Sequence, residues 1–352
     1  MRGTIRLLIV GAGRMGRTHA EAFAAMDGVG IAGVADIDPG AAARMAGAFD
    51  GARPFASVSD ALAALDFDAA ANVTPDAVHH ATTMPLLAAG KHVLCEKPLA
   101  ANAADAARMA GTAQDAGVVH MVNLTYRKVP AMQAAAAMVA RGDIGRVRHF
   151  EASYLQSWLT QPAWGDWRTD PAWLWRLSTA HGSKGVLGDV GIHILDFATH
   201  VAGDGIADIS CRLQTFDKAP GGRIGDYALD ANDSCVMHVG LQGGAIGTVT
   251  ASRFASGHLN DLFLRIYGDT GGLEISFAGG VSLLRSCLGA DLRAARWSEV
   301  ETPPVPPVFE RFIAAIRGEG PADPDFHRGA ALQRVLDAAE ASDVADGRRI
   351  AV

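Results

Sequence analysis

The sequence predicts an α/β protein of two domains, the first built on a doubly wound parallel sheet and the second rich in antiparallel strands. Three observations support this prediction. Apolar strands alternate with helical segments as far as Val122, a glycine-rich turn follows the first strand, and strand-like runs separated by glycine turns follow Ile206. A chain of 352 residues is also long enough for two domains of ordinary size.

Composition and charge narrow the range of partners. Hydrophobic residues make up 49% of the chain and charged residues 20%, which is typical of a folded protein with substantial cores. The formal net charge is −7, so no overall positive field attracts nucleic acid or an anionic membrane. We therefore expect a small-molecule substrate, no nucleic acid, no membrane, and other copies of the chain as partners.

The cysteines and the apolar runs indicate a cytoplasmic protein. The cysteines lie far apart without a C-x-x-C pair, as expected of reduced thiols, and they are Cys95, Cys211, Cys235 and Cys287. No signal peptide is predicted, because Met1 to Thr4 lead directly into the first strand. No apolar run reaches the roughly 18 residues of a transmembrane helix.

The turn after the first strand has the spacing G-x-G-x-x-G. Gly11 is expected to allow the tight turn, Gly13 the approach of a pyrophosphate, and Gly16 the close packing of helix on strand. The helix that follows (14–26) then presents its N–H groups and the positive end of its dipole to the phosphates. Glycine is abundant, with 40 residues in 352, so this motif needs support from its surroundings.

Asp36 supplies that support, because it follows the second strand (31–35) and lies 20 residues after Gly16. This is the separation expected of the carboxylate that accepts hydrogen bonds from the adenosine ribose of a dinucleotide. The alternative is that Asp36 only caps a turn before Pro39.

The neighbours of Asp36 favour NAD over NADP. Asp36 and Asp38 would repel a 2′-phosphate, and the residue between them is Ile37 rather than a basic residue. Arg44 could still turn toward a 2′-phosphate, which keeps NADP as the less favoured alternative.

The βα alternation continues to residue 122. Further helices are expected at 41–49, 59–65, 75–89 and 103–116, and further strands at 69–73, 92–95 and 118–122. Thr74 is expected to cap the third of these helices, with Pro75 in its first turn, and Asn102 to cap the fourth. Ligands of such sheets bind beyond the carboxyl ends of the strands, where Thr74-Pro75 and Glu96-Lys97-Pro98 lie.

The composition changes after Pro130. A helix (131–141) and a strand (147–155) precede a segment that holds five of the six tryptophans: Trp158, Trp164, Trp167, Trp173 and Trp175. Arg168 and Arg176 are interleaved with them. Aromatic faces and guanidinium groups suit a sugar ring, but clustered tryptophans also pack irregular segments over a sheet or anchor subunit contacts. Both interpretations stay open.

A glycine-rich turn and helix (185–201) carry the clearest acid–base candidates. Asp189 and His193 lie four residues apart and so share one helical face. The pKa of an ordinary histidine lies near neutrality, which suits exchange of a hydroxyl proton, while Asp189 could orient the imidazole or bind a hydroxyl. His193, Asp196 and His200 could also ligate zinc, but structural roles for Asp196 and His200 are favoured and no metal is expected.

The rest of the chain is expected to form antiparallel hairpins and two terminal helices. The strands are expected at 210–216, 233–239, 245–254, 262–267, 272–277 and 281–287. Helices are expected at 309–317 and 326–341 after a stiff proline linker (303–307), and the second of them is expected to pack back toward the first domain.

Several separated motifs together resemble the glucose–fructose oxidoreductase, inositol dehydrogenase and rhizopine-catabolism family (Gfo/Idh/MocA), over nearly the whole chain. Besides the glycine turn, they are Asn72-x-Thr74-Pro75-x-x-x-His79, Glu96-Lys97-Pro98, Asn123-x-x-Tyr126-Arg127-x-x-Pro130, Gly188-Asp189-x-Gly191-x-His193-x-x-Asp196 and the ending Asp346-Gly347-Arg348-Arg349-Ile350. The resemblance implies a Rossmann domain (1–123) that binds NAD(P) and a substrate-binding and oligomerisation domain (124–352). It also implies a large, mainly antiparallel, open sheet in the second domain, through which dimers or tetramers form, and a cis Lys97–Pro98 bond.

The resemblance and the patterns described above together give the expected site residues. The catalytic set is Lys97, Asp189 and His193. The cofactor-binding set is Gly11, Gly13, Arg14, Met15, Gly16, Asp36, Ile37, Thr74, Pro75, His79, Glu96 and Lys97. The substrate-binding set is Lys97, Tyr126, Arg127, Trp158, Arg168, Trp175, Arg176, Asp189 and His193.

These features predict an NAD(P)-dependent oxidoreductase that transfers a hydride between a secondary hydroxyl of a sugar, polyol or derivative and the nicotinamide. His193 would act as general acid and base, Lys97 would polarise the reacting oxygen, and Asp189 would orient. Two alternatives use the same fold: an NAD-dependent glycosidase, and a non-catalytic regulator that senses a dinucleotide or a sugar. A metal-dependent hydrolase is the least favoured hypothesis.

Overall fold

The computed structural model describes residues 3–162 and 164–352, without the side chains of Pro171 and Ala172. Met1 and Arg2, on which the expectation of no signal peptide partly rests, lie outside the described residues. The chain packs as two compact units, Met1–Thr125 with Pro306–Gln333 and Tyr126–Val305 with Arg334–Val352. The predicted boundary lies after residue 123, and the predicted second domain includes residues 306–333.

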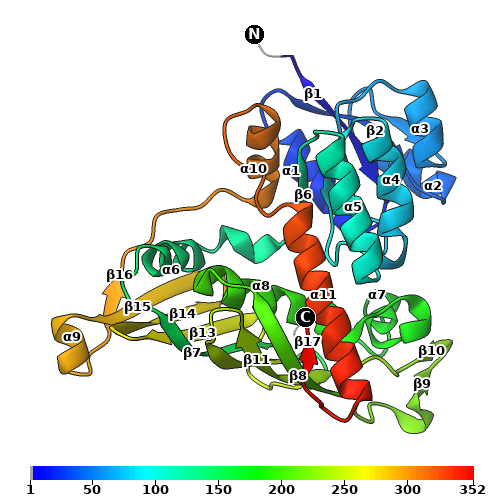
Figure 1. Cartoon of the computed structure of the whole chain (residues 1–352). Helices are drawn as coiled ribbons and strands as arrows, with labels where there is room; N and C mark the ends of the chain where they lie inside the picture. Colours follow the sequence, from blue (N-terminus) through cyan, green and yellow to red (C-terminus); the bar gives the residue numbers. More distant parts are fainter. Residues whose placement is uncertain (1–2, 163) are drawn as a thin grey trace. The chain divides into compact units, whose positions relative to one another are not determined.

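The first unit contains the predicted parallel sheet, in the order β3-β2-β1-β4-β5-β6 (Figure 1). Its strands are β1 (Ile5–Val10), β2 (Val29–Ala35), β3 (Arg53–Phe55), β4 (Ala69–Asn72), β5 (His92–Cys95) and β6 (His120–Val122). Its helices are α1 (Arg14–Ala24), α2 (Pro39–Ala46), α3 (Val58–Ala64), α4 (His79–Ala88), α5 (Ala103–Asp115) and α10 (Val308–Ile316). This is the strand order of a doubly wound dinucleotide-binding fold.

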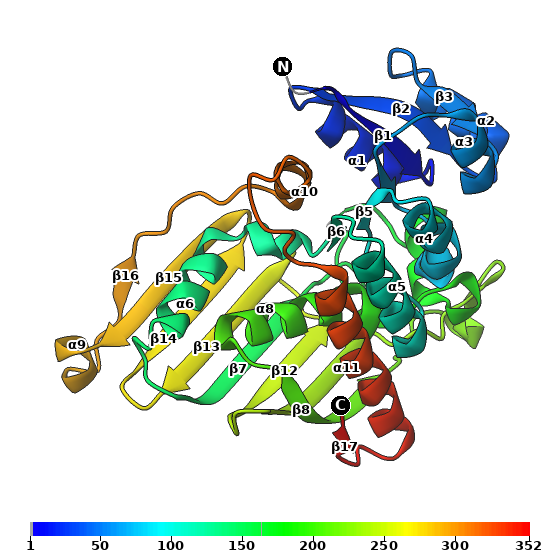
Figure 2. The same cartoon turned by 45° about the horizontal axis from the view of Figure 1, so that its top comes forward.

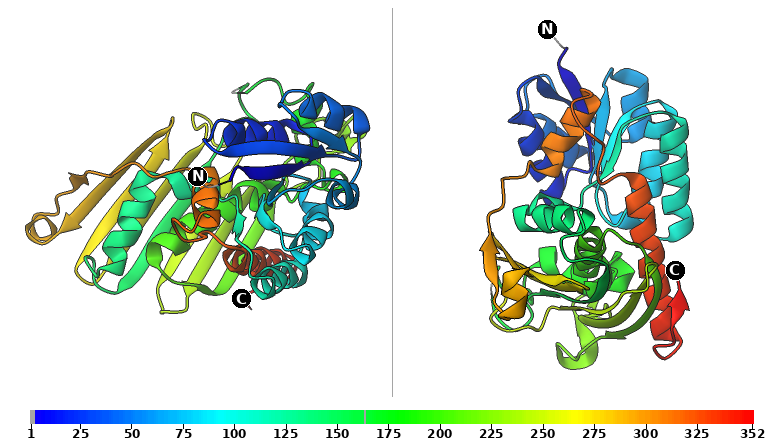
Figure 3. Two further views of the ribbon diagram at one scale, coloured as in Figure 1. Left: turned by 90° about the horizontal axis from the view of Figure 1, so that it is seen from above. Right: turned by 60° about the vertical axis from the view of Figure 1, so that its left-hand side comes forward.

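Helices cover both faces of this sheet, because successive side chains of β1 point to opposite sides. Leu7 and Ile9 pack in one core with Phe23 of α1 and Phe312 of α10. Leu8 and Val10 pack in a second core with residues of α4 and α5, and with Phe326 at the start of α11 (Phe326–Val344). The right-hand view of Figure 3 shows α1 and α10 (blue and orange) on one side of the strands and α4 and α5 (cyan) on the other.

Two local expectations for the first unit were wrong. Strand β3 was not predicted, because it is short, lies at the edge of the sheet and contains Pro54. Thr74 does not cap a helix: its hydroxyl donates to Asn72 Oδ1 at 2.8 Å, and a 3₁₀ turn (Asp76–Val78) precedes α4. Asn102 does cap α5, where its side chain accepts from the N–H of Asp105.

The second unit contains a nine-stranded, mainly antiparallel sheet in the order β16-β15-β14-β13-β7-β12-β11-β8-β17 (Figure 2). The strands are β7 (Val147–Leu155), β8 (Ile206–Gln214), β11 (Ser234–Leu241), β12 (Ile246–Ser252), β13 (Asp261–Gly268), β14 (Gly271–Ala278), β15 (Val281–Leu288), β16 (Ser298–Val300) and β17 (Ile350–Ala351). A small separate hairpin joins β9 (Arg223–Ile224) to β10 (Tyr227–Ala228). The predicted hairpins form, but β12 and β13 are not neighbours, because β7 lies between them and pairs in parallel with β12.

One face of this sheet is covered and the other is open. Helices α6 (Pro130–Ala140) and α8 (Ile192–Ala202) lie across one face, as Figure 2 shows. Leu264 and Ile266 of β13 are fully buried on that side, whereas Val236 and Ile246 on the opposite side are exposed. The second unit also holds two short helices, α7 (Pro171–Leu174) and α9 (Ala290–Arg293).

The segment before α8 is a π-helical turn (Leu187–Gly191), which contains Asp189. Such turns widen a helix locally and are often found at functional sites.

Among the described residues, no helix is long and apolar enough to cross a membrane.

Candidate active site

The glycine turn of the first unit has the geometry that its spacing predicts. Gly11 has a φ of 105°, and a Cβ there would lie 2.7 Å from the carbonyl oxygen of Val73. A Cβ on Gly16 would lie 2.0 Å from the carbonyl oxygen of Gly11, so only glycine lets α1 approach the turn this closely. Gly13 is exposed and a Cβ there would meet nothing within 4 Å, which leaves its outer side open to a ligand.

The amino end of α1 is arranged to bind an anion. Gly13 is its N-cap, and no side chain of the described residues caps the first N–H groups there. Arg14 and Met15 are exposed in the first turn. Uncapped N–H groups at the positive end of a helix form a phosphate site, so this turn fits the pyrophosphate of a dinucleotide.

Asp36 follows β2 and is fixed by two backbone N–H groups. Its Oδ2 accepts from Ala12 at 2.6 Å and its Oδ1 from Asp38 at 2.8 Å. Each carboxylate oxygen can accept a second hydrogen bond, so the group can still bind ribose hydroxyls beside the glycine turn. Ile37 is 94% exposed, and Arg44 lies 3.7 Å from the carboxylate of Asp38. The residue after Asp36 is therefore an exposed isoleucine instead of a cation, and Arg44 lies near Asp38. This arrangement fits NAD.

His79 is buried at the start of α4 and joins two loops. Its Nε2 lies 2.7 Å from the carbonyl oxygen of Thr74, and its Nδ1 lies 2.8 Å from that of Pro98. Carbonyl oxygens only accept, so both ring nitrogens must donate and the ring carries a positive charge. Burial opposes that charge, but the Cys95 sulfur, the Pro98 carbonyl and the Asp76 carboxylate outweigh it and raise the pKa of His79 to about 9. His79 thus connects the loop at Thr74 to the loop at Pro98, both of which carry predicted cofactor-binding residues.

The carboxylate of Glu96 holds the Glu96-Lys97-Pro98 turn in place through three polar contacts. Its Oε1 lies 2.9 Å from His19 Nε2 and accepts from Asn123 Nδ2 at 2.7 Å, and its Oε2 accepts from the backbone N–H of Lys97 at 3.1 Å. Burial alone would raise the pKa of Glu96, but His19, Asn123 and Lys97 lower it to about 2. The Lys97–Pro98 bond is cis, as expected. The backbone around Lys97 is therefore held by buried polar groups, with Pro75 exposed on the neighbouring loop.

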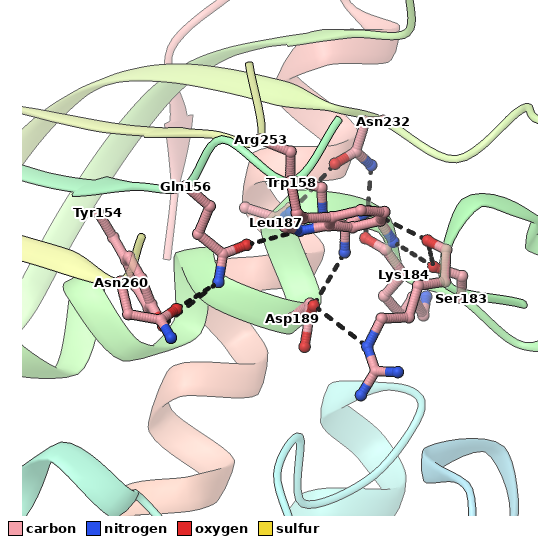
Figure 4. A network of polar contacts seen from close by, with 12 residues as sticks. Tyr154, Gln156, Trp158, Ser183, Lys184, Leu187, Asp189, Asn232, Arg253 and Asn260 are labelled. Atoms are coloured by element: carbon pink, nitrogen blue, oxygen red, sulfur yellow. Dashed lines mark hydrogen bonds and ion pairs between the residues drawn. The ribbon is translucent and has the colours of Figure 1, made fainter. Parts of the chain in front are cut away.

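In the second unit, Asp189 lies beside Arg253, as Figure 4 shows, and near Arg176. Arg253 Nη2 donates to Asp189 Oδ2 at 2.9 Å, and Arg176 Nε lies 3.8 Å from the same oxygen. The side chain of Asp189 is 30% exposed. The carboxylate thus faces two permanent cations, an arrangement that favours its ionised form.

His193 is buried against two tyrosines. The Tyr126 ring meets it edge to face, with 5.0 Å between the ring centroids, and the Tyr154 ring lies 6.4 Å away. The Tyr126 and Tyr154 hydroxyls are hydrogen-bonded, and Tyr154 donates in turn to Asn260 Oδ1 at 2.9 Å. Burial is the main cause that raises the pKa of Tyr126 to about 12 and that of Tyr154 well above its ordinary value. Both phenols stay protonated beside the imidazole.

The tryptophan-rich segment packs largely on itself. Trp158 and Trp167 are buried in a small core with Leu174, Leu177 and Leu229. Arg168 lies over Trp167 and is otherwise exposed, and Arg176 lies over Trp175 at 4.6 Å. The packing supports the structural interpretation for the buried rings, while Trp175 and Arg176 are half-buried. Their role in substrate binding stays a prediction.

Arg127 does not project toward an open surface. It is buried and donates to Asp196 through Nε at 2.7 Å and Nη2 at 2.8 Å. Gln133 donates to the Arg127 carbonyl oxygen and lies 3.2 Å from His200 Nε2. This buried pair gives Asp196 a structural partner, and the contact of Arg127 with substrate stays a prediction. Within the described part of the chain, no three His, Cys, Asp or Glu side chains gather as metal ligands would.

Sequence reasoning missed the residues that hold the candidates in place. Arg253 follows β12, Asn260 precedes β13 and Gln156 follows β7, and none of them lies in a motif. Each reaches its partner across a long stretch of sequence. The one sequence signal that could have indicated Arg253 is its charge, because every other residue of the predicted strand 245–254 is uncharged.

The comparisons with known proteins agree with this geometry. The model described as "Oxidoreductase family, NAD-binding Rossmann fold" matches residues 5–124, and that of the GFO/IDH/MocA C-terminal domain matches residues 132–274. Levoglucosan dehydrogenase of Pseudarthrobacter phenanthrenivorans is 28% identical over 76% of this chain and 73% of its own length. Inositol 2-dehydrogenase of Rhizobium meliloti is 26% identical over 99% of both chains.

Solved structures are similar over the full length. An oxidoreductase domain protein from Kribbella flavida is 29% identical, with a TM-score of 0.84 and coverage of 100% of both chains. Levoglucosan dehydrogenase in complex with NADH and levoglucosan is 26% identical, with a TM-score of 0.83 and coverage of 99% of both chains.

Proposed function

The chain belongs to the Gfo/Idh/MocA family of oxidoreductases with an NAD-binding Rossmann fold, and we propose that it oxidises a secondary hydroxyl of a sugar, a polyol or a related compound. The observation that carries this proposal is the presence of both halves of the chemistry. The glycine turn and Asp36 fit NAD, and Lys97, Asp189 and His193 supply a cation, an anion and a base. The substrate class is supported by relatives named for levoglucosan and inositol.

The roles of the residues follow from their chemistry. His193 takes the proton of the substrate hydroxyl, because an imidazole exchanges protons near neutral pH. Lys97 stabilises the negative charge that develops on the same oxygen, and Asp189 orients the substrate or the imidazole. Bound NAD⁺ supplies the hydride acceptor. Protonated Tyr126 and Tyr154 fix the His193 ring from one side.

An NAD⁺-reduction screen tests this proposal. It should include levoglucosan, inositols, anhydrosugars, L-sorbose, sugar acids and sugar phosphates. Lys97→Met and His193→Asn should each lower kcat/KM on the best substrate by about 10²–10⁴-fold while the thermal shift caused by NAD⁺ is retained. His327→Asn is the control, because His327 is exposed on α11. Full activity in both variants would contradict the assignment.

The same assay separates the alternatives. A glycosidase of this fold would release an aglycone without net NADH, and a sensor would bind ligand without turnover. A dinucleotide preference for NADP would contradict the reading of Asp36 and Ile37. The cytoplasmic location stays a prediction, which the four buried free cysteines support.

The open face of the large sheet supports self-association. Val236, Ile246 and Leu283 are exposed there, beside a row in which Arg265 pairs with Glu274 at 3.0 Å and Arg285 with Glu274 at 2.8 Å. A mixed apolar and charged face of this kind suits a second copy of the chain. Light scattering should give the mass of a dimer or tetramer, and Val236→Glu with Ile246→Glu should give a monomer. A monomeric wild type would contradict this proposal.

A further inference from the structure

Arg253 is the most completely buried cation beside the candidate acid–base residues described above. It follows β12 directly and is fully buried. Its Nη2 donates to Asp189 Oδ2 at 2.9 Å, and its Nη1 donates to the carbonyl oxygen of Arg176 at 3.1 Å. The two terminal nitrogens therefore hold the guanidinium between the π-helical turn and the segment before it (Figure 4).

The surroundings of Arg253 keep this orientation. The guanidinium carbon lies 5.1 Å from the ring centroid of Trp158, a cation–π contact. Trp158 is fixed in turn, because its Nε1 donates to Gln156 Oε1 at 3.1 Å and Gln156 Nε2 donates to Asn260 at 2.7 Å. The backbone N–H of Arg253 donates to the carbonyl oxygen of Asp233 at 2.9 Å. The backbone N–H, the face of the guanidinium and both terminal nitrogens of Arg253 thus each have a partner.

Stability by itself does not explain why the guanidinium of Arg253 is buried, because burying a charge costs free energy. Burial is the main influence on the pKa of Arg253 and lowers it, while Asp189 acts in the opposite direction. The Nε of Arg253 is buried without a hydrogen-bond partner among the described residues. Buried ion pairs often contribute little net stability, and an unsatisfied buried donor costs more. A functional demand on Asp189 gives a reason for the arrangement.

We propose that Arg253 is a positioning residue for Asp189, which keeps this side chain a carboxylate and sets the direction it presents to the substrate. The proposal rests on the proposed function, in which Asp189 orients without exchanging a proton. Arg176 is the second cation near the same oxygen, but its side chain is 28% exposed and it lies farther away. Arg253 is therefore the nearer and the more deeply buried of these two arginines.

Two neutral groups also lie near Asp189. Tyr126 and Tyr154 interact electrostatically with Asp189, and both are protonated phenols. His193 lies four residues further along the chain, in α8. Removing Arg253 takes away a buried cation that donates to Asp189 Oδ2 at 2.9 Å, while the carboxylate is only 30% exposed to water. We therefore expect the pKa of Asp189 to rise in a variant without Arg253.

The pH dependence of kcat/KM on the best substrate tests this role. Arg253→Gln should move the acidic limb of the profile upward by about one pH unit, because Asp189 loses a buried cation that favours its charged form. Arg253→Lys should keep the wild-type limb with a lower kcat. Arg148→Gln is the matched control, since Arg148 also pairs with a carboxylate, Asp269 at 2.7 Å, at the start of β7. An unshifted limb in folded Arg253→Gln would overturn the proposal.

A second measurement needs no substrate. In Arg253→Gln, the Asp189 carboxylate loses a buried cation that favours its charged form, so its pKa should be higher than in the wild type and its ionisation should add less stability as the pH rises. Between pH 3 and pH 6, the melting temperature of Arg253→Gln relative to Arg253→Gln/Asp189→Asn should therefore rise less than that of the wild type relative to Asp189→Asn. Equal pH dependence in both would contradict the proposal.

The design also separates the possible failures. If Arg253→Gln does not fold, the double variant should fold, because it also removes the carboxylate that has lost Arg253. Failure of the double variant would mean that Arg253 is required for packing, and would overturn the positioning role. If no sugar or polyol is oxidised, the proposed function fails, whereas the melting comparison still tests the Arg253–Asp189 pair.

Discussion

Two candidate sites present polar groups to a ligand by different means. One is the glycine turn of the first unit, and the other is the cluster of Asp189, Arg176 and Arg253 in the second unit. In the glycine turn, the backbone provides the site, and the residues that shape it lie within six positions of one another, from Gly11 to Gly16. In the cluster, charged side chains provide the site, and Arg253 and Asp189 are 64 positions apart. A site made of backbone should be sensitive to any added carbon, and a site made of charges should be sensitive to pH and to charge removal.

The largest effect is expected at the buried ion pair of the second unit. Arg127→Met leaves the Asp196 carboxylate buried without its bidentate partner, and should cost about 3–5 kcal/mol of unfolding free energy. Arg127→Met/Asp196→Leu should recover most of that loss, because neither charge then remains. Denaturant unfolding followed by circular dichroism measures both. A double variant no more stable than the single one would show that Arg127 acts by its shape instead of its charge.

A pair of glycine variants should separate folding from cofactor binding in the first unit. Gly16→Ala should destabilise by about 1–3 kcal/mol, since its Cβ would lie 2.0 Å from the Gly11 carbonyl oxygen. Gly13→Ala should keep its melting temperature, because its Cβ meets nothing within 4 Å, and should weaken NAD⁺ binding about tenfold or more by occupying the ligand side.

Melting curves and NAD⁺ titration calorimetry measure these two effects. Gly111→Ala is the control, since Gly111 lies within α5 with open space around it. Unchanged NAD⁺ affinity in Gly13→Ala would contradict the assignment of this turn to the pyrophosphate.

The choice of dinucleotide should change with two substitutions. Asp36→Ala/Ile37→Arg should lower kcat/KM with NAD⁺ by about tenfold and raise it with NADP⁺, because a cation replaces the carboxylate beside the ribose. Ile37→Arg alone is the control and should change the ratio less. An unchanged NAD⁺/NADP⁺ ratio in the double variant would refute the ribose role of Asp36.

The smallest effects are expected from the pH dependence of the two buried anchors. The pKa of His79 is raised from 6.5 to about 9, so its stabilising contribution is complete below pH 6.5 and is lost as the pH rises through 9. The pKa of Glu96 is lowered from 4.5 to about 2, so its contribution is present above pH 4.5 and is lost as the pH falls through 2. Melting of His79→Gln and Glu96→Gln against the wild type measures each loss.

Nuclear magnetic resonance gives a direct check on His79. At pH 8 both of its ring nitrogens should carry a proton, as two carbonyl acceptors require. His92 is the internal control, because burial lowers its pKa and its Nδ1 accepts from the Val119 N–H. A neutral His79 ring at pH 8 would show that one of the two contacts is not a hydrogen bond.

The fold of the first unit could be predicted almost completely, because its signals are local. Strand β5 and the Asn102 cap of α5 lie where the pattern placed them. The errors occurred where local signals were weak or ambiguous. Strand β3 is three residues long with a proline, and Thr74 had a nearer partner in Asn72 than the helix it was expected to cap.

The second unit shows the limits of that reasoning. The longer strands were recognised individually, whereas the short strands β9, β10 and β16 were not predicted. The insertion of β7 between β12 and β13 depends on contacts about 100 positions apart, which no local pattern encodes. Tyr126 and Arg127 are adjacent in the sequence and equal as motif members. Tyr126 meets His193 and Arg127 is buried against Asp196, a difference that only packing decides.

The sequence by itself determined the dinucleotide turn, the position of Asp36 and the family, because glycine requirements and strand–helix spacing act within a few residues. Only the tertiary structure decided which charges meet. It paired Arg253 with Asp189 and Arg127 with Asp196, and it placed His79 between two carbonyl groups. Such contacts join distant segments whose approach is set by the packing of whole elements, and buried charges persist only where that packing brings them a partner.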